Sequence, residues 1–339
     1  MAVRIGINGF GRIGRQSLRA IKEYHSHDLQ VVAINTPATI DTIARLLKYD
    51  SDYGKFNGTV ETAKNALIID GKEVKVTAKR DPKDIPWKDT GVDIVLESAG
   101  HFRDRDKAAL HLEHGAKKVI ITAPVRTKNE DITIVFGVNE SKYDAANHHV
   151  ISNASCTTNC VAPLAKVLHK EFGIKKGFIS TIHAYTTDQR LLDNSHKDPR
   201  RGRAAALNII PTSTGAGPST GIVLPELQGK LMGIAFRVPT STVSLTDFEV
   251  SLDKEASVEE VNNTLRAAAA NSMNGILEFC EEPLVSSDFK GNPASSIVDG
   301  LSTMSVGGNM IKILAWYDNE WGYSARTADL AAYIAQQGL

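Results

Sequence analysis

The feature that most constrains the fold is a turn with three glycines near the start of the chain. Residues 9–14 are Gly-Phe-Gly-Arg-Ile-Gly, directly after the β-branched segment Val3–Ile7 and ahead of a helical pattern. In this setting Gly9 and Gly11 allow a tight turn and a close backbone approach, and Gly14 lets the helix pack on the strand. The helix N-terminus then suits a dinucleotide pyrophosphate. A glycine turn without a ligand is the alternative, although three glycines cost backbone entropy that a simple turn does not need.

The first half of the chain alternates short β-branched segments with helical patterns. Such alternation indicates βαβ units and a doubly wound, mostly parallel sheet of the Rossmann type, in an α/β domain. The predicted strands are Val3–Ile7, Gln30–Ile34, Val92–Leu96, Lys118–Thr122, Ile132–Phe136 and His148–Ile151, and the predicted helices are Gln16–Tyr24, Asp41–Leu47 with Asp41 as N-cap, and Asp104–His114.

The middle of the chain has a different pattern. Gly177–His183, Met232–Arg237 and Val243–Leu252 are longer and alternate more strictly, as in a mixed or antiparallel sheet with one covered face. A chain of 339 residues is too long for one ordinary core and fits two domains. We therefore expect a second, α+β domain. The last helical pattern, Ala325–Gln336, fits either domain.

Charge and composition exclude several classes of function. The chain has 39 basic and 39 acidic residues, so it offers no net field to a nucleic acid or a membrane surface. No apolar run approaches the roughly 18 residues that span a bilayer, and the start enters a strand without a secretory pattern. The three cysteines do not suggest a disulfide framework. We expect a cytoplasmic enzyme whose main function involves neither nucleic acid nor membrane.

The end of the second predicted strand bears on the choice of cofactor. Folds that bind NAD carry an acid there that bonds the ribose hydroxyls, but this strand ends in Asn35 and Thr36 without a carboxylate. A carboxylate would repel the extra phosphate of NADP, whereas Asn35 and Thr36 can donate hydrogen bonds to it. The sequence predicts that NADP is accepted, unless the choice is set elsewhere in the chain.

A cysteine at the start of a helical segment is the candidate nucleophile. Cys156 follows a predicted strand and begins an apolar helical run that continues to Phe172. Free backbone N–H groups and the helix dipole lower the pKa of a thiol at such a position. Cys160, one turn later, and Cys280 are predicted to be inert. A metal site needs more ligands of suitable spacing than this stretch offers, so none is predicted.

A thiolate needs a base or an orienting cation, and His183 is the best candidate among ten histidines. It ends a predicted strand, from which its ring would point into a cleft. Imidazole can polarise the thiol and then accept the hydroxyl proton of the tetrahedral adduct. A purely structural histidine is the alternative, because spacing alone does not select this residue.

Positive charge is concentrated beyond His183. Residues 196–203 are His-Lys-Asp-Pro-Arg-Arg-Gly-Arg, and Arg237 lies inside a strand-like segment where a buried cation needs an anionic partner. With the hydroxyl-rich turn at residues 212–215, these residues predict binding sites for phosphate groups. A solvated basic loop is the alternative for any single residue of the segment.

Together these segments resemble the phosphorylating glyceraldehyde-3-phosphate dehydrogenase family along essentially the whole chain. The most specific match is Ser-Asn-Ala-Ser-Cys-Thr-Thr-Asn-Cys at 152–160, the family's active-site segment, and residues 7–15 match its cofactor fingerprint. Segments 196–198, 237–240 and 316–323 also fit. The resemblance implies a dinucleotide-binding domain at 1–154 and 319–339, which includes the C-terminal helix, and a catalytic domain at 155–318.

The resemblance also implies the residues around each ligand and a homotetramer. Cys156 is implied as the nucleophile and His183 as its partner. The implied contacts are Ser155, Thr157, Thr214 and Gly215 for inorganic phosphate, Thr186, Arg201 and Arg237 for substrate phosphate, and Arg12, Ile13, Arg80, Thr122, Asn319 and Tyr323 for the dinucleotide, beside the glycine turn.

Three positions depart from the family's usual pattern. NAD-using members have aspartate in place of Thr36, and a Leu-Pro pair in place of Asn194 and Ser195. Serine there resembles the photosynthetic, NADP-using branch, in which it reaches the cofactor of a neighbouring subunit. Both changes indicate that NADP is accepted. The third departure, Gly217-Pro218-Ser219 for the usual Ala-Lys pair, removes a positive charge near the phosphate turn.

The implied reaction converts glyceraldehyde 3-phosphate and inorganic phosphate into 1,3-bisphosphoglycerate through a thioester on Cys156. Hydride passes reversibly to NAD or NADP, as in glycolysis or gluconeogenesis. Three alternatives remain at this point. They are an erythrose-4-phosphate dehydrogenase that hydrolyses the thioester, a cysteine hydrolase that uses Cys156 and His183, and a non-catalytic dinucleotide-binding regulator.

Overall fold

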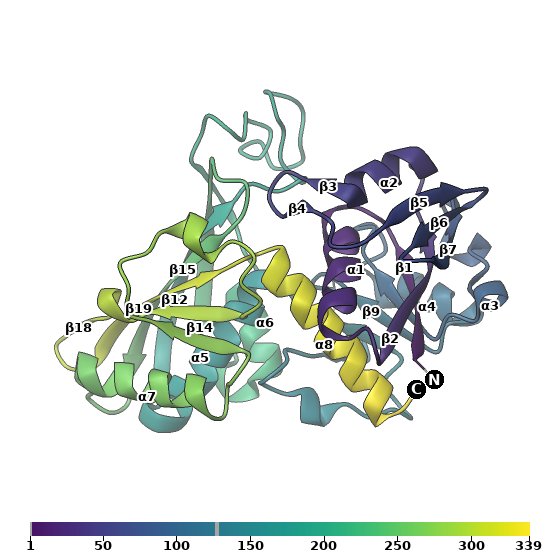
Figure 1. The fold of residues 1–339 in the computed structure, drawn as a ribbon. Helices are drawn as coiled ribbons and strands as arrows, with labels where there is room; N and C mark the ends of the chain where they lie inside the picture. Colours follow the sequence, from purple (N-terminus) through teal and green to yellow (C-terminus); the bar gives the residue numbers. More distant parts are fainter. Residues whose placement is uncertain (1, 126–128) are drawn as a thin grey trace. The chain divides into compact units, whose positions relative to one another are not determined.

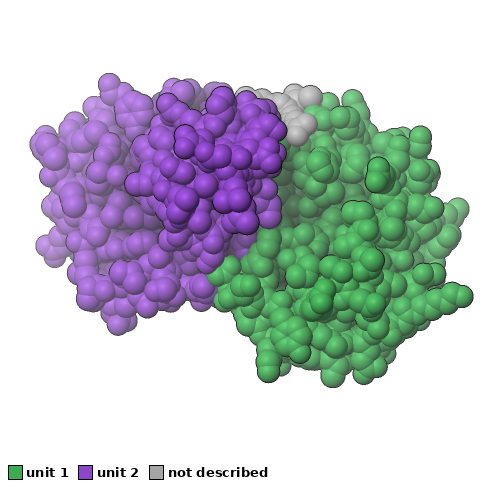
Figure 2. Space-filling model, turned by 90° about the horizontal axis from the view of Figure 1, so that it is seen from above, with its two compact units in different colours: residues 1–134, 141–154, 324–339 green, residues 135–140, 155–323 purple. Residues whose placement is uncertain are grey.

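The computed structural model describes residues 2–125 and 129–339, which form two compact units. Unit 1 contains Met1–Ile134, Ser141–Ala154 and Ser324–Leu339, and unit 2 contains Val135–Glu140 and Ser155–Tyr323 (Figure 2). Residues 319–323, which the resemblance assigns to the dinucleotide-binding domain, group with unit 2. Within the described ranges, no helix is long and apolar enough to cross a membrane.

A nine-stranded sheet forms the centre of unit 1, in the order β10-β11-β9-β8-β1-β2-β7-β6-β5 (Figure 1). All neighbours from β10 to β7 pair in parallel, and β5, β6 and β7 pair antiparallel. The chain goes from β1 to β2 on one side and later to β8 on the other, which confirms the doubly wound arrangement. The strands are β1 Val3–Asn8, β2 Leu29–Asn35, β5 Val60–Ala63, β6 Ala66–Ile69, β7 Lys72–Thr77, β8 Ile94–Glu97, β9 Lys118–Ile121, β10 Ile132–Thr133 and β11 Val150–Ser152, with a separate pair of β3 Tyr49–Asp50 and β4 Gly54–Lys55.

Most helices of unit 1 follow the predicted patterns, but three begin earlier than expected, at Arg12, Ile40 and Trp321. The helix after the glycine turn starts at Arg12 because Gly11, in an extended conformation, is its N-cap. The predicted N-cap Asp41 is wrong. The next helix is capped by Thr39, whose hydroxyl accepts from Thr42 N at 3.4 Å, and Asp41 lies in the first turn, where its charge complements the helix dipole. The helices are α1 Arg12–Tyr24, α2 Ile40–Lys48, α3 Trp87–Thr90, α4 Arg105–Glu113 and α8 Trp321–Gln337, and short 3-10 turns lie at Pro82–Asp84 and Glu140–Lys142.

The C-terminal helix α8 contributes to the core of unit 1. Ala328, Leu330, Ala331 and Ile334 are fully buried in the same apolar cluster as strand β1. Burying a large aliphatic side chain contributes about 1.5–3 kcal/mol, so this part of α8 is held firmly.

A mixed sheet of eight strands forms unit 2, with the order β13-β14-β12-β15-β19-β17-β16 and β18 paired to β19. Helices α5 and α6 pack on one face of it (Figure 1). Along β15, burial alternates without exception from Ser244 to Leu252, the pattern expected of a sheet with one covered face. The elements are α5 Cys156–Phe172, β12 Ile174–Ala184, β13 Ile210–Ser213, α6 Ala216–Val223, β14 Leu231–Val238, β15 Ser244–Leu252, α7 Val258–Ala270, β16 Leu277–Cys280, β17 Ser296–Asp299, β18 Met304–Val306 and β19 Met310–Tyr317, and 3-10 turns lie at Pro225–Leu227, Ser286–Phe289 and Gly300–Ser302.

Two pairings within this sheet are parallel, that of β16 with β17 and that of β12 with β14. Strand β12 pairs antiparallel with β15 on one side but parallel with β14 on the other. The segment between β12 and β14 is long enough for a crossover, because it contains a loop at 185–209, β13 and α6. Strand periodicity does not distinguish the two directions of pairing.

A chain of buried polar side chains joins the carboxyl ends of strands β8, β1 and β2 in unit 1. Trp87 Nε1 donates to His111 Nδ1 at 2.9 Å, so the ring proton of His111 is on Nε2, which donates to Glu97 Oε2 at 2.9 Å. The carboxylate of Glu97 also accepts from Asn8 Nδ2 at 2.5 Å and from Ala99 N at 2.8 Å. Every polar contact of the Glu97 carboxylate is therefore a donor from the protein.

We predict that Glu97→Gln lowers the free energy of unfolding of the protein by about 2 kcal/mol. A glutamine has one acceptor oxygen, so its NH2 group must face a buried donor, which leaves that donor unpaired. Urea titration of both proteins measures the difference. Glu61→Gln, at an exposed position of β5, is the matched control and should stay within about 0.5 kcal/mol of the wild type. Equal stability of the Glu97 variant would contradict this account of the network.

Candidate active site

The candidate nucleophile and base come together within unit 2. Helix α5 begins at Cys156, and Ser155 is its N-cap, with Oγ accepting from Thr158 N at 3.0 Å. His183 lies one residue before the end of β12, and its Nε2 is 3.4 Å from Cys156 Sγ. A contact at this distance allows a proton to pass between sulfur and nitrogen.

The parallel register of β12 and β14 places a cation beside this pair. His183 lies directly opposite Arg237 in the register. Arg237 Nη1 is 2.8 Å from His183 Nδ1 and 3.0 Å from the carbonyl oxygen of Ala184, and that oxygen is 2.7 Å from His183 Nδ1. The ring nitrogen that faces away from the cysteine is therefore in contact with two polar atoms at once.

Burial dominates the protonation equilibria of the pair. It raises the pKa of the Cys156 thiol, and the positive charge of Arg237 offsets only part of that change. Burial, followed by the charge of Arg237, lowers the pKa of His183 to about 3. The helix N-terminus was expected to lower the pKa of the thiol, and desolvation acts in the opposite direction.

Tyr317 supports the pair from the end of β19. Its ring lies edge-on to the ring of His183, with 6.0 Å between the centroids. Its buried hydroxyl contacts Thr157 Oγ1 at 2.9 Å and Thr181 Oγ1 at 2.8 Å. In the sequence, Tyr317 stands out only as part of the segment 316–323. The alternating burial of β19, in which Tyr317 ends the covered face, is the signal that singles it out.

The predicted phosphate ligands differ in the ion pairs and hydrogen bonds that they already form within the protein. Arg201 forms an ion pair with Asp188, and its Nε donates to Thr212 Oγ1 at 2.9 Å. Among the described residues no carboxylate pairs with Arg237, and its buried Nε has no hydrogen-bond partner. Thr186 Oγ1 lies 3.5 Å from Arg237 Nη1. These two residues are brought together, whereas Arg201 is engaged by an acid.

The turn before α6 has the expected form of a helix N-terminus. Gly215 is the N-cap, and Thr214 Oγ1 accepts from Ala216 N at 3.3 Å. Pro218 lies in the first turn of α6, where a missing N–H costs nothing. A Cβ on Gly217 would meet the carbonyl oxygen of Leu231 at 2.5 Å, which explains the glycine. The sequence departure at 217–219 therefore fits the helix it belongs to.

The glycine turn of unit 1 shows which glycines the fold requires. A Cβ on Gly9, at φ +91°, would lie 2.4 Å from Ala99 N, and one on Gly14 would lie 2.2 Å from Gly9 O. A Cβ on Gly11 would meet nothing within 4 Å. Packing thus explains Gly9 and Gly14 but not Gly11, and the open space at Gly11 fits the close approach of a pyrophosphate.

At the end of strand β2, the side chain of Asn35 is already hydrogen-bonded within the protein, which the sequence did not indicate. Asn35 Nδ2 donates to Asn8 Oδ1 at 2.8 Å and to Lys79 O at 2.9 Å, and Asn35 Oδ1 accepts from Lys79 N and from Thr77 Oγ1, both at 2.8 Å. Both N–H groups of Asn35 are therefore in use. Thr36, the other residue predicted to bear on the choice of cofactor, is 6% exposed.

The other predicted cofactor residues lie in both units. Arg12 Nη1 is 2.5 Å from Asp50 Oδ2, and Thr122 Oγ1 donates to Glu97 O at 3.1 Å. In unit 2, Asn319 Oδ1 accepts from Ser244 Oγ at 2.8 Å. Of the rest, Tyr323 is buried, Ile13 is half-buried, and Arg80 and Ser195 are exposed. In the part of the chain that the structure describes, no cluster of three or more His, Cys, Asp or Glu could hold a metal.

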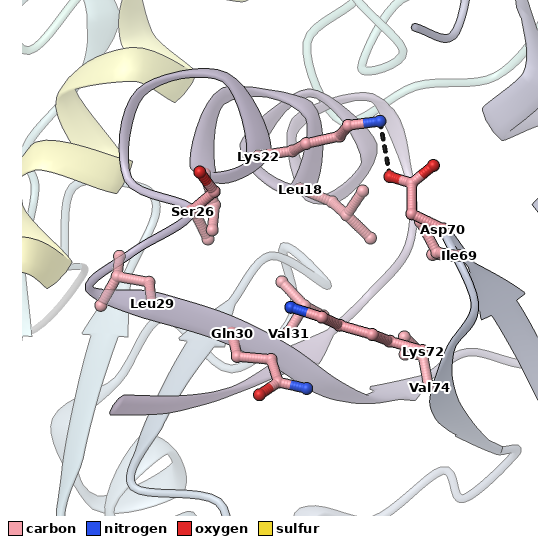
Figure 3. A pocket seen from close by; sticks show the side chains of 11 residues that line it. Leu18, Lys22, Ser26, Leu29, Gln30, Val31, Ile69, Asp70, Lys72 and Val74 are labelled. Atoms are coloured by element: carbon pink, nitrogen blue, oxygen red, sulfur yellow. Dashed lines mark ion pairs between the residues drawn. The ribbon is translucent and has the colours of Figure 1, made fainter. Parts of the chain in front are cut away.

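A separate hollow lies within unit 1 (Figure 3). It has a volume of about 240 Å³ and an apolar floor that includes Leu18 and Val31, and Lys22 and Asp70 form an ion pair of 2.6 Å at its rim. It adjoins the last turns of α1 and the start of β2. Ligands of parallel sheets bind at the carboxyl ends of the strands, so the hollow is at the wrong end for the dinucleotide.

The fold of unit 1 is that of a dinucleotide-binding domain, as in dehydrogenases that use a nicotinamide cofactor. A family model described as "Glyceraldehyde 3-phosphate dehydrogenase, NAD binding domain" matches residues 3–105, and one described as "Glyceraldehyde 3-phosphate dehydrogenase, C-terminal domain" matches residues 155–319. The chain is 58% identical to glyceraldehyde-3-phosphate dehydrogenase of Geobacillus stearothermophilus, with 100% of both chains covered. It is 57% identical to glyceraldehyde-3-phosphate dehydrogenase 1 of Bacillus subtilis (strain 168), with 100% of both covered, and 54% identical to the Streptomyces coelicolor enzyme, with 99% and 100% covered.

The chain belongs to the glyceraldehyde-3-phosphate dehydrogenase family. Its members are dehydrogenases that use a nicotinamide cofactor, and the match extends over the whole chain. The family predicted from the sequence is thereby confirmed. An erythrose-4-phosphate dehydrogenase, a cysteine hydrolase and a non-catalytic regulator are not favoured.

The lowered pKa of His183 predicts how stability depends on pH. Its ordinary value is 6.5 and its value in the folded protein is about 3, so the unfolded chain binds a proton in this interval that the folded protein excludes. Stability therefore falls as the pH falls from 6.5 towards 3. Between pH 7 and pH 4.5, His183→Asn should lose about 2 kcal/mol less than the wild type, measured by urea titration at each pH. Parallel losses in the two proteins would show that His183 is readily protonated in the fold.

Proposed function

We propose that the enzyme oxidises glyceraldehyde 3-phosphate, with inorganic phosphate, to 1,3-bisphosphoglycerate through a thioester on Cys156. The observation that carries this proposal is the 3.4 Å contact between Cys156 Sγ and His183 Nε2 at the N-terminus of α5. The reaction serves glycolysis or, in reverse, gluconeogenesis. The family membership of the chain supports the same reaction.

In this proposal His183 transfers the proton, and the start of α5 stabilises the negative charge that develops. His183 Nε2 takes the thiol proton as Cys156 Sγ bonds to the aldehyde carbon, and backbone N–H groups at the start of α5 stabilise the oxygen that becomes negative. His183 gives that proton to the oxygen of the adduct and takes it back as the hydride leaves, while the bound nicotinamide supplies the hydride-accepting chemistry. Inorganic phosphate attacks the thioester carbon, the C–S bond breaks, and the sulfur leaves as a thiolate, to which His183 returns the proton.

Two phosphate positions fit the side chains around the thiol. Arg237 and Thr186, which lie beside His183, and Arg201 are proposed to bind the phosphate of the substrate. The start of α6 at Gly215, with Thr214 and the hydroxyls of Ser155 and Thr157, is proposed to hold inorganic phosphate. Arginine suits the first position because its planar fork matches two phosphate oxygens.

A homotetramer in the cytoplasm is proposed for the working enzyme. The loop at 185–209, which extends away from the sheet of unit 2 (Figure 1), exposes Leu191 at 80%, Leu192 at 73% and Leu207 at 79%. Phe178 and Met232, register partners on β12 and β14, are 63% and 59% exposed. Apolar side chains gathered in this way are typical of interfaces. All three cysteines are free, which suits a reducing compartment.

Both cofactors are proposed to be accepted. The dinucleotide residues proposed here are the glycine turn with Arg12 and Ile13, Thr36, Arg80, Thr122, Asn319, Tyr323 and, from a neighbouring subunit, Ser195. Because Asn35 uses both amide hydrogens within the protein, the hypothesis that NADP binds well rests on Thr36 and Ser195.

We predict that Cys156→Ser retains the fold and dinucleotide binding but loses oxidation of glyceraldehyde 3-phosphate by several orders of magnitude. A hydroxyl at its ordinary pKa is a far weaker nucleophile than a thiol. Stopped-flow formation of the reduced dinucleotide, with and without inorganic phosphate, provides the measurement. Cys160→Ser is the matched control. Cys160 is fully buried, its thiol contacts Ser296 Oγ at 3.6 Å, and burial raises its pKa to about 12. Near-normal turnover of Cys156→Ser would end the thioester mechanism.

We predict that Thr36→Asp raises the Michaelis constant for NADP much more than that for NAD. A carboxylate facing the extra phosphate costs about 1–3 kcal/mol, which is roughly a ten- to hundredfold loss of affinity. Steady-state kinetics of both proteins with each cofactor provide the comparison. Thr39→Asp, at the nearby exposed cap of α2, is a control for added charge. A wild type that uses NADP a hundredfold worse than NAD contradicts the hypothesis about both positions.

A further inference from the structure

A buried serine at the start of β15 joins the residue after the candidate base to a predicted cofactor residue. Ser244 Oγ accepts from Ala184 N at 3.1 Å, and Ala184 directly follows His183, whose Nδ1 is 2.7 Å from the carbonyl oxygen of Ala184. The hydroxyl of Ser244 donates to Asn319 Oδ1 at 2.8 Å. Ser244 is 1% exposed, so solvent does not compete for its hydroxyl. One side chain thus connects the end of β12 with the segment that follows β19.

The hydroxyl of Ser244 fixes which way round the amide of Asn319 lies. A buried O–H group needs an acceptor, and among the described residues Asn319 Oδ1 is the acceptor that Ser244 reaches. If the amide were turned over, its NH2 group would face an oxygen that already accepts from Ala184 N, and the Ser244 proton would lose its acceptor. The amide oxygen is therefore held toward Ser244, and Nδ2 is directed the other way.

The Nδ2 group of Asn319 is left without a protein partner. Asn319 is 5% exposed, and within residues 2–125 and 129–339 its side chain makes one hydrogen bond, through Oδ1. An N–H group that is nearly buried and has no acceptor costs free energy in a finished core. A donor in this state suits a position that a ligand completes.

The backbone around Asn319 is held as well as its side chain. The buried carboxylate of Asp318 accepts from Thr242 Oγ1 at 2.9 Å and from two N–H groups at the start of α8 at 3.0 and 2.9 Å. Thr242 and Ser244 therefore hold two consecutive residues. Val243, between them, is buried at φ +66°, a left-handed conformation that β-branched residues rarely adopt. Backbone strain of this kind persists where the surrounding structure imposes it, and it is concentrated at ligand sites.

We propose that Ser244 is a positioning residue that holds the N–H group of Asn319 toward the carboxamide oxygen of the nicotinamide. Hydride leaves a carbon bonded to Cys156 Sγ, so the nicotinamide has to lie close to Cys156 and His183. The carboxamide is the polar group of that ring, and it has one acceptor oxygen and one NH2 donor. Because Ser244 occupies Oδ1, Asn319 offers the ring a donor alone and selects the orientation in which the carboxamide oxygen faces it. The inference rests on the dinucleotide dependence of the proposed function.

The first test is the affinity of full-length Ser244→Ala for NAD without substrate, measured by isothermal titration calorimetry. Without the hydroxyl, the amide of Asn319 has to be ordered when the dinucleotide binds. We expect the dissociation constant to rise about fivefold, the share of one hydrogen bond. Adenosine diphosphate ribose, which has no nicotinamide, should bind equally well to the variant and the wild type. An unchanged affinity for NAD, or an equal loss with adenosine diphosphate ribose, would overturn the proposal.

Ser251→Ala is the matched control on the same strand. Ser251 is half-buried near the end of β15, and its side chain forms no hydrogen bond with any described residue. The control should bind both ligands as the wild type does.

A double-mutant cycle shows whether Ser244 acts through Asn319. Asn319→Ala removes the proposed donor and should weaken binding of NAD at least as much as Ser244→Ala does. In that background Ser244→Ala should cause no further loss, because there is no amide left to hold. Additive losses would show that Ser244 acts by another path, and the proposal would be wrong.

The direction of the Asn319 amide is tested with 3-acetylpyridine adenine dinucleotide. This analogue keeps the carbonyl oxygen of the carboxamide but has a methyl group in place of NH2. Asn319→Asp replaces the donor with an oxygen, so it should weaken binding of the analogue about tenfold more than binding of NAD, whose NH2 group can turn toward the carboxylate. An unchanged ratio of the two affinities would show that the amide oxygen faces the ligand in the wild type, which contradicts the proposal.

These measurements also separate the inference from the proposed function. If glyceraldehyde 3-phosphate is oxidised but Ser244→Ala binds NAD as the wild type does, the positioning role is wrong and the function stands. If the affinities change as expected but glyceraldehyde 3-phosphate gives no reduced dinucleotide, the proposed function fails and the positioning role stands.

Discussion

The parallel pairing of β12 with β14 is the constraint on which the chemistry of unit 2 depends. It places His183 opposite Arg237, and the packing of α5 against β12 brings Cys156 to the other side of the same ring. A slip of one residue in this pairing would turn Arg237 to the opposite face of the sheet and leave His183 without a cation. The parallel direction in turn requires the long crossover that contains the loop at 185–209 and α6.

The two units differ in how completely their buried polar groups are hydrogen-bonded. In unit 1 the carboxylate of Glu97 accepts from Asn8, Ala99 and His111, and Asn35 uses both of its amide hydrogens, so the carboxyl edge of the sheet is held rigidly before any ligand binds. In unit 2, His183 Nδ1 and Arg237 Nη1 share one acceptor, the carbonyl oxygen of Ala184, at 2.7 and 3.0 Å, and the buried Nε of Arg237 has no hydrogen-bond partner.

Burial is the largest influence on the pKa values of Cys156 and His183 in the protein without ligands. Desolvation raises the pKa of the Cys156 thiol and lowers the pKa of the His183 imidazole to about 3. The start of α5 offers backbone N–H groups to a developing oxyanion.

Local patterns in the sequence were enough to predict the glycine turn, the Rossmann-type sheet, the helix that begins at Cys156 and the covered face of β15. These features depend on residues a few positions apart, through backbone freedom, capping and side-chain periodicity. Four features were decided only in the folded chain: the cap at Thr39 in place of Asp41, the hydrogen bonds of Asn35 to its neighbours, the raised pKa of the Cys156 thiol, and the contact of Arg237 with His183. Each depends on strand register or on burial among residues distant in the sequence, and no local pattern encodes these.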